Sequence, residues 1–234
     1  GANQKPNETR LDLVQKNAKI MTDVVTQIKE QEYKGILLIV SNPVDIMTQV
    51  AMEVSGFPEH RVFGSGTVLD SARLRYHLGQ HLGVDSRSVH AFVIGEHGDS
   101  EIAAWSSANV SGVPLNSFCE MRGHFNHEGN TESIEEQVKN SAYEIIAKKD
   151  ATYYGIAMVV KRICQAIVRD EKSIFPISLR MHGEYALEDV VLSMPAIVGA
   201  RGIETTIPIS LDEKEVSRLH ESAEMLRETR KEIR

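Results

Sequence analysis

The chain has 234 residues, of which 41% are hydrophobic and 25% are charged, and its formal net charge is −7 at pH 7. These are ordinary globular proportions, and the length allows one large domain or two smaller ones. The chain has no block of basic side chains to neutralise phosphates, which argues against nucleic acid as a partner. The only cysteines, Cys119 and Cys164, lie far apart, so we expect a reducing, cytoplasmic setting. The longest apolar run, 35–40, is too short to cross a membrane.

The first part of the chain alternates helices and strands. Apolar residues spaced by three and four predict an opening amphipathic helix. Residues 35–40 are apolar without alternation, as in a strand covered on both faces of a parallel sheet. Asn42 and Pro43 are predicted to be the N-cap and first residue of the next helix. The expected elements are helices over 11–28 and 43–54, strands over 35–40 and 61–63, and a tight turn over 64–66.

In the rest of the chain, the predicted helices and strands are segregated and do not alternate. It is predicted to contain helices over 67–82, about 132–149, 155–169 and from Asp212, and strands over 89–94, within 102–112, and over 175–179, 190–198 and 203–207. We therefore expect an α/β fold in which residues 1–64 form the second half of a doubly wound Rossmann-type domain and residues 65–234 form an α+β catalytic domain.

A dinucleotide-binding domain should open with a strand followed by Gly-x-Gly-x-x-Gly at a helix start. The nearest match is Gly-Ser-Gly-Thr-Val-Leu at 64–69, where Leu69 stands in place of the third glycine. Because no strand is predicted before the first helix, the chain looks cut. We expect the phosphate-binding, N-terminal half of the nucleotide domain to be absent.

Four polar residues could carry chemistry, although each has a simpler structural interpretation. His97 lies in a glycine-flanked loop after a strand, where an imidazole with a pKa near about 6.5 can exchange protons at neutral pH, but it could be a surface histidine. Asp70 and Arg73 share a helix face and could orient a histidine and grip a carboxylate. Thr67-x-x-Asp70 also has the form of a capping box. Arg10 could be carried by a closing lid or be a solvated helix-end arginine.

Together, four strings at matching spacing resemble the L-lactate and malate dehydrogenase family. They are residues 1–13 (Gly-Ala-Asn-Gln-Lys-Pro-Asn-Glu-Thr-Arg-Leu-Asp-Leu), 41–45 (Ser-Asn-Pro-Val-Asp), 64–73 (Gly-Ser-Gly-Thr-Val-Leu-Asp-Ser-Ala-Arg) and 95–100 (Gly-Glu-His-Gly-Asp-Ser). The resemblance extends to the C-terminal helix. It implies an NAD-dependent oxidoreductase that interconverts L-lactate and pyruvate by hydride transfer.

The resemblance also implies residue roles. His97 would protonate the pyruvate carbonyl oxygen, and Asp70 would hold the tautomer of the imidazole. Arg73 would bind the substrate carboxylate through two hydrogen bonds, and Arg10 would polarise the carbonyl when the lid over 1–10 closes. Further contacts are implied for substrate at Asn42 and Thr152, and for the cofactor at Val40, Asn42, Ser65 and Ile156.

Substrate choice is expected to depend on Gln4. In the malate dehydrogenases of this family an arginine stands here to pair with a second carboxylate, whereas the neutral Gln4 suits the methyl group of pyruvate. A malate dehydrogenase or a broader 2-hydroxy acid dehydrogenase is the alternative within the enzyme class. The alternative from another class is a catalytically silent fragment that acts as a scaffold or an oligomer subunit.

Arg75 and His90 form a further candidate site. Arg75 lies two residues past Arg73, about 200° around the helix, and should therefore face solvent or a partner subunit. These could be an unrelated solvated arginine and strand histidine. In similar bacterial lactate dehydrogenases, an arginine and a histidine at these places bind fructose bisphosphate across a subunit interface. We therefore expect a homotetramer with fructose 1,6-bisphosphate as its effector.

Overall fold

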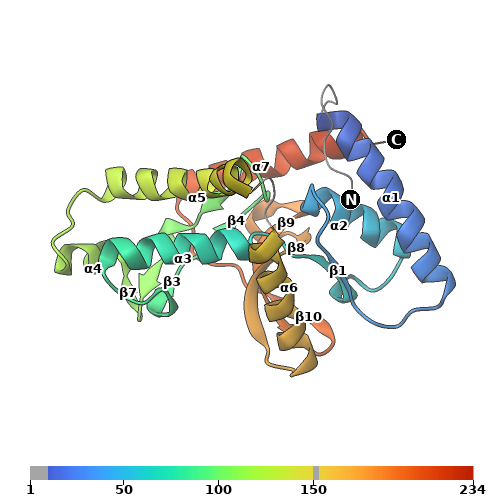
Figure 1. The fold of residues 1–234 in the computed structure, drawn as a ribbon, viewed down its shortest axis with the longest axis horizontal. Helices are drawn as coiled ribbons and strands as arrows, with labels where there is room; N and C mark the ends of the chain where they lie inside the picture. Colours follow the sequence, from blue (N-terminus) through green and yellow to red (C-terminus); the bar gives the residue numbers. More distant parts are fainter. Residues whose placement is uncertain (1–9, 150–152, 234) are drawn as a thin grey trace.

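The computed structural model describes the backbone of residues 10–149 and 153–233, with side chains described over 13–141 and 153–233 (Figure 1). The helices are α1 (Arg10–Glu30), α2 (Val44–Ser55), α3 (Val68–Leu82), α4 (Leu115–Met121), α5 (His127–Lys149), α6 (Tyr153–Val168) and α7 (Glu213–Lys231). The strands are β1 (Leu37–Ile39), β2 (Val62–Gly64), β3 (Val89–His90), β4 (Val93–Ile94), β5 (Ile102–Ala103), β6 (Asn109–Val110), β7 (Val113–Pro114), β8 (Ser173–His182), β9 (Glu188–Gly199) and β10 (Gly202–Thr206).

One mixed sheet joins the two parts of the chain. Its strand order is β1-β2-β8-β9-β10, in which β1 and β2 are parallel and β8, β9 and β10 are antiparallel. The parts meet where Gly64 of β2 pairs with Ser178 of β8. The predicted antiparallel strands of the second part therefore exist, but they extend the sheet that the first part begins. Hydrophobic periodicity predicts a strand and not its partner, so the sequence did not show this pairing.

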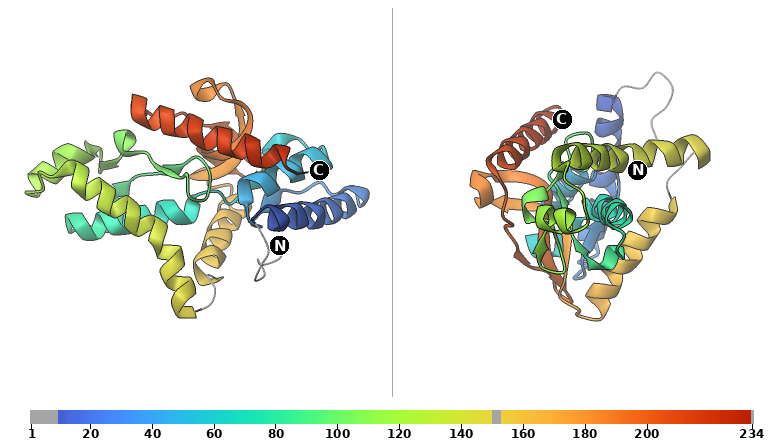
Figure 2. Two further views of the ribbon diagram at one scale, coloured as in Figure 1. Left: turned by 90° about the horizontal axis from the view of Figure 1, so that it is seen from above. Right: turned by 90° about the vertical axis from the view of Figure 1, so that its left-hand side faces the viewer.

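Two groups of buried apolar residues support this arrangement. The larger lies around the five-stranded sheet and includes Met47, Phe63 and Met194. The smaller includes Leu74 of α3 and Ile134 of α5. Figures 1 and 2 show α3 and α5 extending together from one side of the sheet, while α1 and α2 lie at the other side. The amino end of α3 therefore lies where the two groups meet, beside the sheet.

Three local predictions are wrong in detail. Helix α2 begins at Val44, because Pro43 is extended (φ −68°, ψ 120°) and follows a cis peptide bond from Asn42, so neither residue has its predicted capping role. The single strand expected over 89–94 is two short strands with different partners, since β3 pairs with β6 and β4 pairs with β5. Helix α4 was not predicted at all.

The turn before α3 requires glycine. Gly66 has φ +52°, and a Cβ atom there would lie 2.6 Å from the carbonyl oxygen of Pro176 on β8. A side chain at this position would therefore push the start of α3 away from the sheet. The C-terminal helix α7 begins at Glu213, one residue after the predicted start, and Asp212 is its N-cap in a capping box with Glu215. Within the described residues, no helix is long and apolar enough to cross a membrane.

Candidate active site

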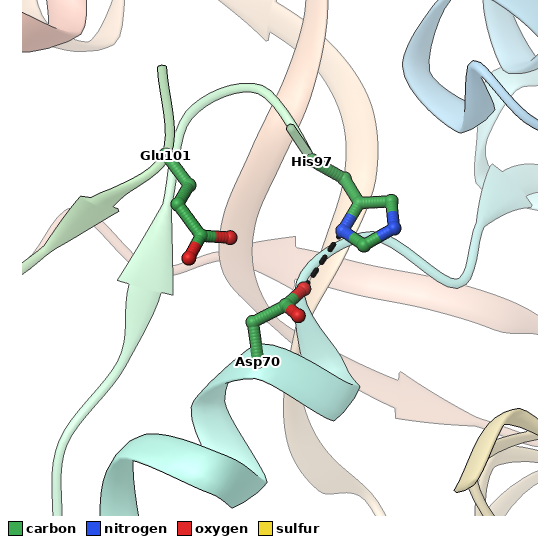
Figure 3. A group of neighbouring side chains, drawn as sticks. All are labelled: Asp70, His97 and Glu101. Atoms are coloured by element: carbon green, nitrogen blue, oxygen red, sulfur yellow. Dashed lines mark hydrogen bonds and ion pairs between the residues drawn. The ribbon is translucent and has the colours of Figure 1, made fainter. Parts of the chain in front are cut away.

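Asp70 connects the two other residues of the predicted acid/base site. Its Oδ2 lies 2.7 Å from Nδ1 of His97, and its Oδ1 accepts a hydrogen bond of 3.0 Å from Nη1 of Arg73. Figure 3 shows the His97 ring turned so that Nδ1 faces Asp70 and the second ring nitrogen points away. Among the described residues, none is hydrogen-bonded to that second nitrogen, Nε2. The three residues that the sequence separates by up to 27 positions therefore meet at one place, and Nε2 is left for a substrate.

The first turn of α3 is held against β4 by two hydroxyl groups. Oγ1 of Thr67 donates to the carbonyl oxygen of Val93 over 2.5 Å, and Oγ of Ser71 accepts from the backbone N–H of Val93 over 2.8 Å. The predicted capping box of Thr67 and Asp70 is therefore wrong, because both side chains bond to distant residues. These bonds fix Asp70 relative to the strand that leads to His97.

The loop that carries His97 is hydrogen-bonded to β9 and to α7. Gly95 exchanges two backbone hydrogen bonds with Ser193 of β9 (2.9 and 2.8 Å). The N–H of Glu96 donates to Oγ of Ser222 on α7 over 2.8 Å. Gly95 has φ +84°, and a Cβ atom there would lie 2.9 Å from Ile102, so glycine is required. The loop that carries the imidazole is thus anchored by hydrogen bonds, even though no named helix or strand contains His97.

Asp45 on α2 is a site residue that the sequence reasoning missed. Its side chain is buried, and it accepts hydrogen bonds from the backbone N–H of His97 (2.7 Å) and from Oγ of Ser178 (2.6 Å). Burial raises the pKa of Asp45 to about 6, against the lowering effect of those hydrogen bonds and of the His97 charge. Asp45 belongs to the 41–45 string, and this was the one signal that could have pointed to it. An acidic residue in the first turn of a helix otherwise suggests only a favourable interaction with the helix dipole.

The environment keeps a proton on His97. Burial alone lowers the pKa of the imidazole, but the hydrogen bond and charge of Asp70, together with the charges of Asp45 and Glu101, raise it to about 9. Burial likewise opposes ionisation of Asp70, whose pKa nevertheless falls below its usual value because of His97 and Arg73. At neutral pH the pair is therefore an imidazolium beside a carboxylate. It can give a proton to a substrate oxygen, and a neutral imidazole can take one back.

Arg73 has N–H donors that are not used by Asp70. Its side chain is 15% exposed, and only Nη1 is bonded to Asp70, which leaves other N–H groups of the planar guanidinium for an anion. A carboxylate bound there would lie beside the imidazole.

Three of the four predicted cofactor residues lie at the carboxyl ends of β1 and β2. Val40 and Asn42 follow β1 and are exposed, whereas Ser65 follows β2 and is buried. Ile156 on α6 is partly buried against the main core. Ligands of open α/β sheets bind at this edge. An exposed valine here fits the apolar face of a nicotinamide ring.

Three predicted residues are not fully described. Gln4 and Thr152 lie outside the described residues. Arg10 is the first residue of α1, and its side chain lies outside the described part. The predicted roles of these three residues therefore stay predictions.

The two predicted effector residues lie on α3 and β3. His90 is exposed on β3, and Arg75 lies partly exposed on α3, where burial lowers its pKa from the ordinary arginine value. That Arg75 faces away from His97 stays a prediction. Whether Arg75 and His90 bind an anion also stays a prediction.

Comparison with known proteins identifies the family. Residues 1–64 match the lactate/malate dehydrogenase NAD binding domain, and residues 67–234 match the lactate/malate dehydrogenase alpha/beta C-terminal domain. The chain belongs to the lactate/malate dehydrogenase family. The predicted family, fold class and NAD cofactor are therefore confirmed.

The relatives within the family are L-lactate dehydrogenases. The chain is 48% identical to the L-lactate dehydrogenase of Acetivibrio thermocellus and covers 72% of that protein with 97% of its own length. It is also 48% identical to L-lactate dehydrogenase 1 of Lactococcus lactis subsp. cremoris, with 97% of this chain and 70% of the relative covered.

A solved structure of the minor L-lactate dehydrogenase from Enterococcus mundtii, in its ligand-bound form, superposes with a TM-score of 0.96 at 42% identity. The superposition covers 100% of this chain and 74% of that one. These proteins do not favour the alternatives of a malate dehydrogenase, a broader 2-hydroxy acid dehydrogenase or a silent scaffold.

Proposed function

We propose that the protein interconverts L-lactate and pyruvate with NAD, with His97 as its acid/base group. The observation that carries this assignment is the contact of the Asp70 carboxylate with both His97 and Arg73. Asp70 and His97 can then transfer the proton, while the adjacent guanidinium of Arg73 binds the carboxylate that every 2-hydroxy acid carries. NAD, when bound, supplies or accepts the hydride at the substrate C2.

In pyruvate reduction, His97 donates the proton of Nε2 to the carbonyl oxygen as C2 is reduced. Asp70 stabilises the imidazolium before the transfer and holds Nδ1 protonated after it, so the ring keeps one orientation throughout. Arg73 binds the carboxylate of pyruvate and thereby places the carbonyl against His97. Arg10 adds a positive charge at the carbonyl oxygen, and Asn42 and Thr152 complete the substrate contacts. Lactate oxidation reverses these steps and requires neutral His97.

The residues that contact NAD are proposed to be Val40, Asn42, Ser65 and Ile156. The exposure of Val40 and Asn42 after β1, and the apolar surface of Val40, support this assignment for the nicotinamide end. This end of the cofactor is the one that reacts.

Substrate choice is proposed to depend on Gln4. The substitution Gln4→Arg adds a cation that suits the second carboxylate of oxaloacetate and leaves a desolvated charge beside the methyl group of pyruvate. We expect the ratio of kcat/KM for oxaloacetate over pyruvate to rise by about 10²-fold or more, as for charged pairs in closed sites. Gln4→Met is the matched neutral control and should leave pyruvate preferred. An unchanged ratio in Gln4→Arg would contradict the role proposed for Gln4.

We further propose a homotetramer activated by fructose 1,6-bisphosphate at Arg75 and His90. Two-fold symmetry would bring two copies of each residue together against two phosphates, and the exposure of His90 leaves it accessible to a partner. The double substitution Arg75→Gln, His90→Gln is expected to abolish any lowering of the pyruvate KM by fructose bisphosphate. Arg87→Gln, which removes an exposed arginine paired with Asp85, is the control. A wild-type pyruvate curve that ignores fructose bisphosphate would refute the effector site.

A cytoplasmic location is proposed as well. It is supported by the absence of a disulfide among the described cysteines, since Cys119 and Cys164 are both free.

A further inference from the structure

Glu101 is a second buried carboxyl group beside the acid/base pair. It follows directly after the loop that carries His97, and only 6% of the residue is exposed. One ligand atom from each of Asp70, His97 and Glu101 lies within 4.8 Å of the other two. Figure 3 shows the Glu101 carboxyl group directed toward Asp70 and the His97 ring. Neither the motifs nor the mechanism above accounts for an acid at this position.

The backbone holds Glu101 in place. Its N–H donates to the carbonyl oxygen of Gly98 (3.2 Å), and its own carbonyl oxygen accepts from Arg218 of α7 (3.4 Å). Within the described part of the chain, no hydrogen bond reaches its side-chain carboxyl group. An ionised carboxylate with so little solvent and no hydrogen bond is costly, and the Asp70 charge makes it costlier.

The charges of Asp70 and Arg73 from α3, of His97 from its loop and of Lys139 from α5 act on this carboxyl group. Arg218 of α7 donates to the backbone carbonyl oxygen of Glu101, and Glu135 of α5 is paired with both Lys139 and Arg218. Burial and then the charge of Asp70 raise the pKa of Glu101 to about 8, although His97, Lys139 and Arg73 each lower it.

Proton chemistry fits this cluster better than a metal ion. A cation bound by Oδ2 of Asp70 and Nδ1 of His97 would have to displace the proton that these two atoms share. A carboxyl group that exchanges its own proton needs no such rearrangement.

We propose that Glu101 is a positioning residue of the acid/base pair, a carboxylic acid at neutral pH that ionises in alkaline solution and there holds the proton on His97. This inference rests on the proposed role of His97. At neutral pH an uncharged Glu101 leaves Asp70 as the single anion shared by His97 and Arg73. Above pH 8 its negative charge adds to that of Asp70, so the imidazolium survives to a higher pH than Asp70 alone would allow.

The test compares wild-type protein with Glu101→Gln, which keeps the size of the side chain and cannot ionise. The ¹⁵N resonances of the His97 ring report its titration directly. We expect Glu101→Gln to lower the midpoint by about one pH unit. That shift implies about five-fold slower pyruvate reduction at pH 9 and about five-fold faster lactate oxidation at pH 8.

Two further variants separate this role from packing. Glu101→Asp keeps an ionisable carboxyl group and should move the midpoint back toward the wild-type value. Glu120→Gln removes a carboxylate from the exposed side chain of Glu120 on α4, so it is the charge-matched control and should not move the midpoint.

The outcomes distinguish this inference from the proposed function. Superimposable His97 titrations in wild-type protein and Glu101→Gln would overturn the inference, and so would a lower Tm with an unchanged midpoint, which indicates packing alone. A lowered midpoint with unchanged turnover at every pH would support the coupling of Glu101 to His97 and refute His97 as the acid/base group.

Discussion

Replacing His97 by asparagine is expected to lower kcat for pyruvate reduction by about 10²- to 10⁴-fold, the usual contribution of a positioned proton donor. Asparagine can still hydrogen-bond to Asp70, so the fold around the site should persist. It cannot supply a proton from the position of Nε2, and the carbonyl oxygen would have to take its proton from water. The measurement is steady-state turnover of pyruvate at saturating substrate and NADH.

His220→Gln is the matched control for this substitution. His220 is exposed on α7 and its ring bonds only to the carbonyl oxygen of Tyr185, so its loss removes an imidazole outside the proposed site. We expect its kcat to remain within about two-fold of the wild-type value. A His97→Asn protein with the same turnover as the control would show that another group donates the proton.

Replacing Asp70 by asparagine is expected to move the pH dependence more than any other single change. The carboxylate is the main cause that raises the pKa of His97 to about 9, whereas burial acts in the opposite direction. Without the negative charge, the pKa of His97 should fall to about 6.5 or lower. Because reduction needs the imidazolium, the rate at pH 8.5 should drop by about 100-fold, with a much smaller loss near pH 6.

The control for Asp70→Asn is Asp85→Asn. Asp85 is also paired with an arginine, Arg87, but lies exposed at the end of the loop after α3. The control should reproduce the wild-type pH profile. If Asp70→Asn also kept the wild-type profile and lost activity equally at every pH, Asp70 would act through geometry alone.

Much of the fold could be predicted from local patterns. The apolar spacing placed α1, α3 and α7 within one or two residues, because a helix buries a stripe that repeats every three or four residues. The signals for Asp70, Arg73 and His97 were weak singly, and only their order and spacing made them specific.

The remaining features depend on contacts between distant residues. Thr67 has the sequence signature of a helix cap, but its hydroxyl bonds to Val93, which lies 26 residues away. Asp45 looks like an acidic residue that merely favours the first turn of a helix, yet its carboxylate accepts a hydrogen bond from the backbone N–H of His97, which lies 52 residues away. Glu101 gives no local signal, since its importance comes from burial beside a second carboxylate. Such roles are set by tertiary packing, which periodicity and motif spacing do not encode.

The pH dependence of kcat/KM in both directions, measured on wild-type protein and Asp70→Asn, tests most directly whether His97 carries the proton. If His97 carries the proton and Asp70 holds it there, pyruvate reduction in the wild type falls as the pH rises through about 9. Lactate oxidation rises through the same pH, and both limbs move to lower pH together in Asp70→Asn. If kcat/KM for reduction and for oxidation changed in the same direction with pH, His97 would not be the group that carries the proton. If the two profiles kept their midpoints in Asp70→Asn, the Asp70 carboxylate would not be what holds the proton on His97.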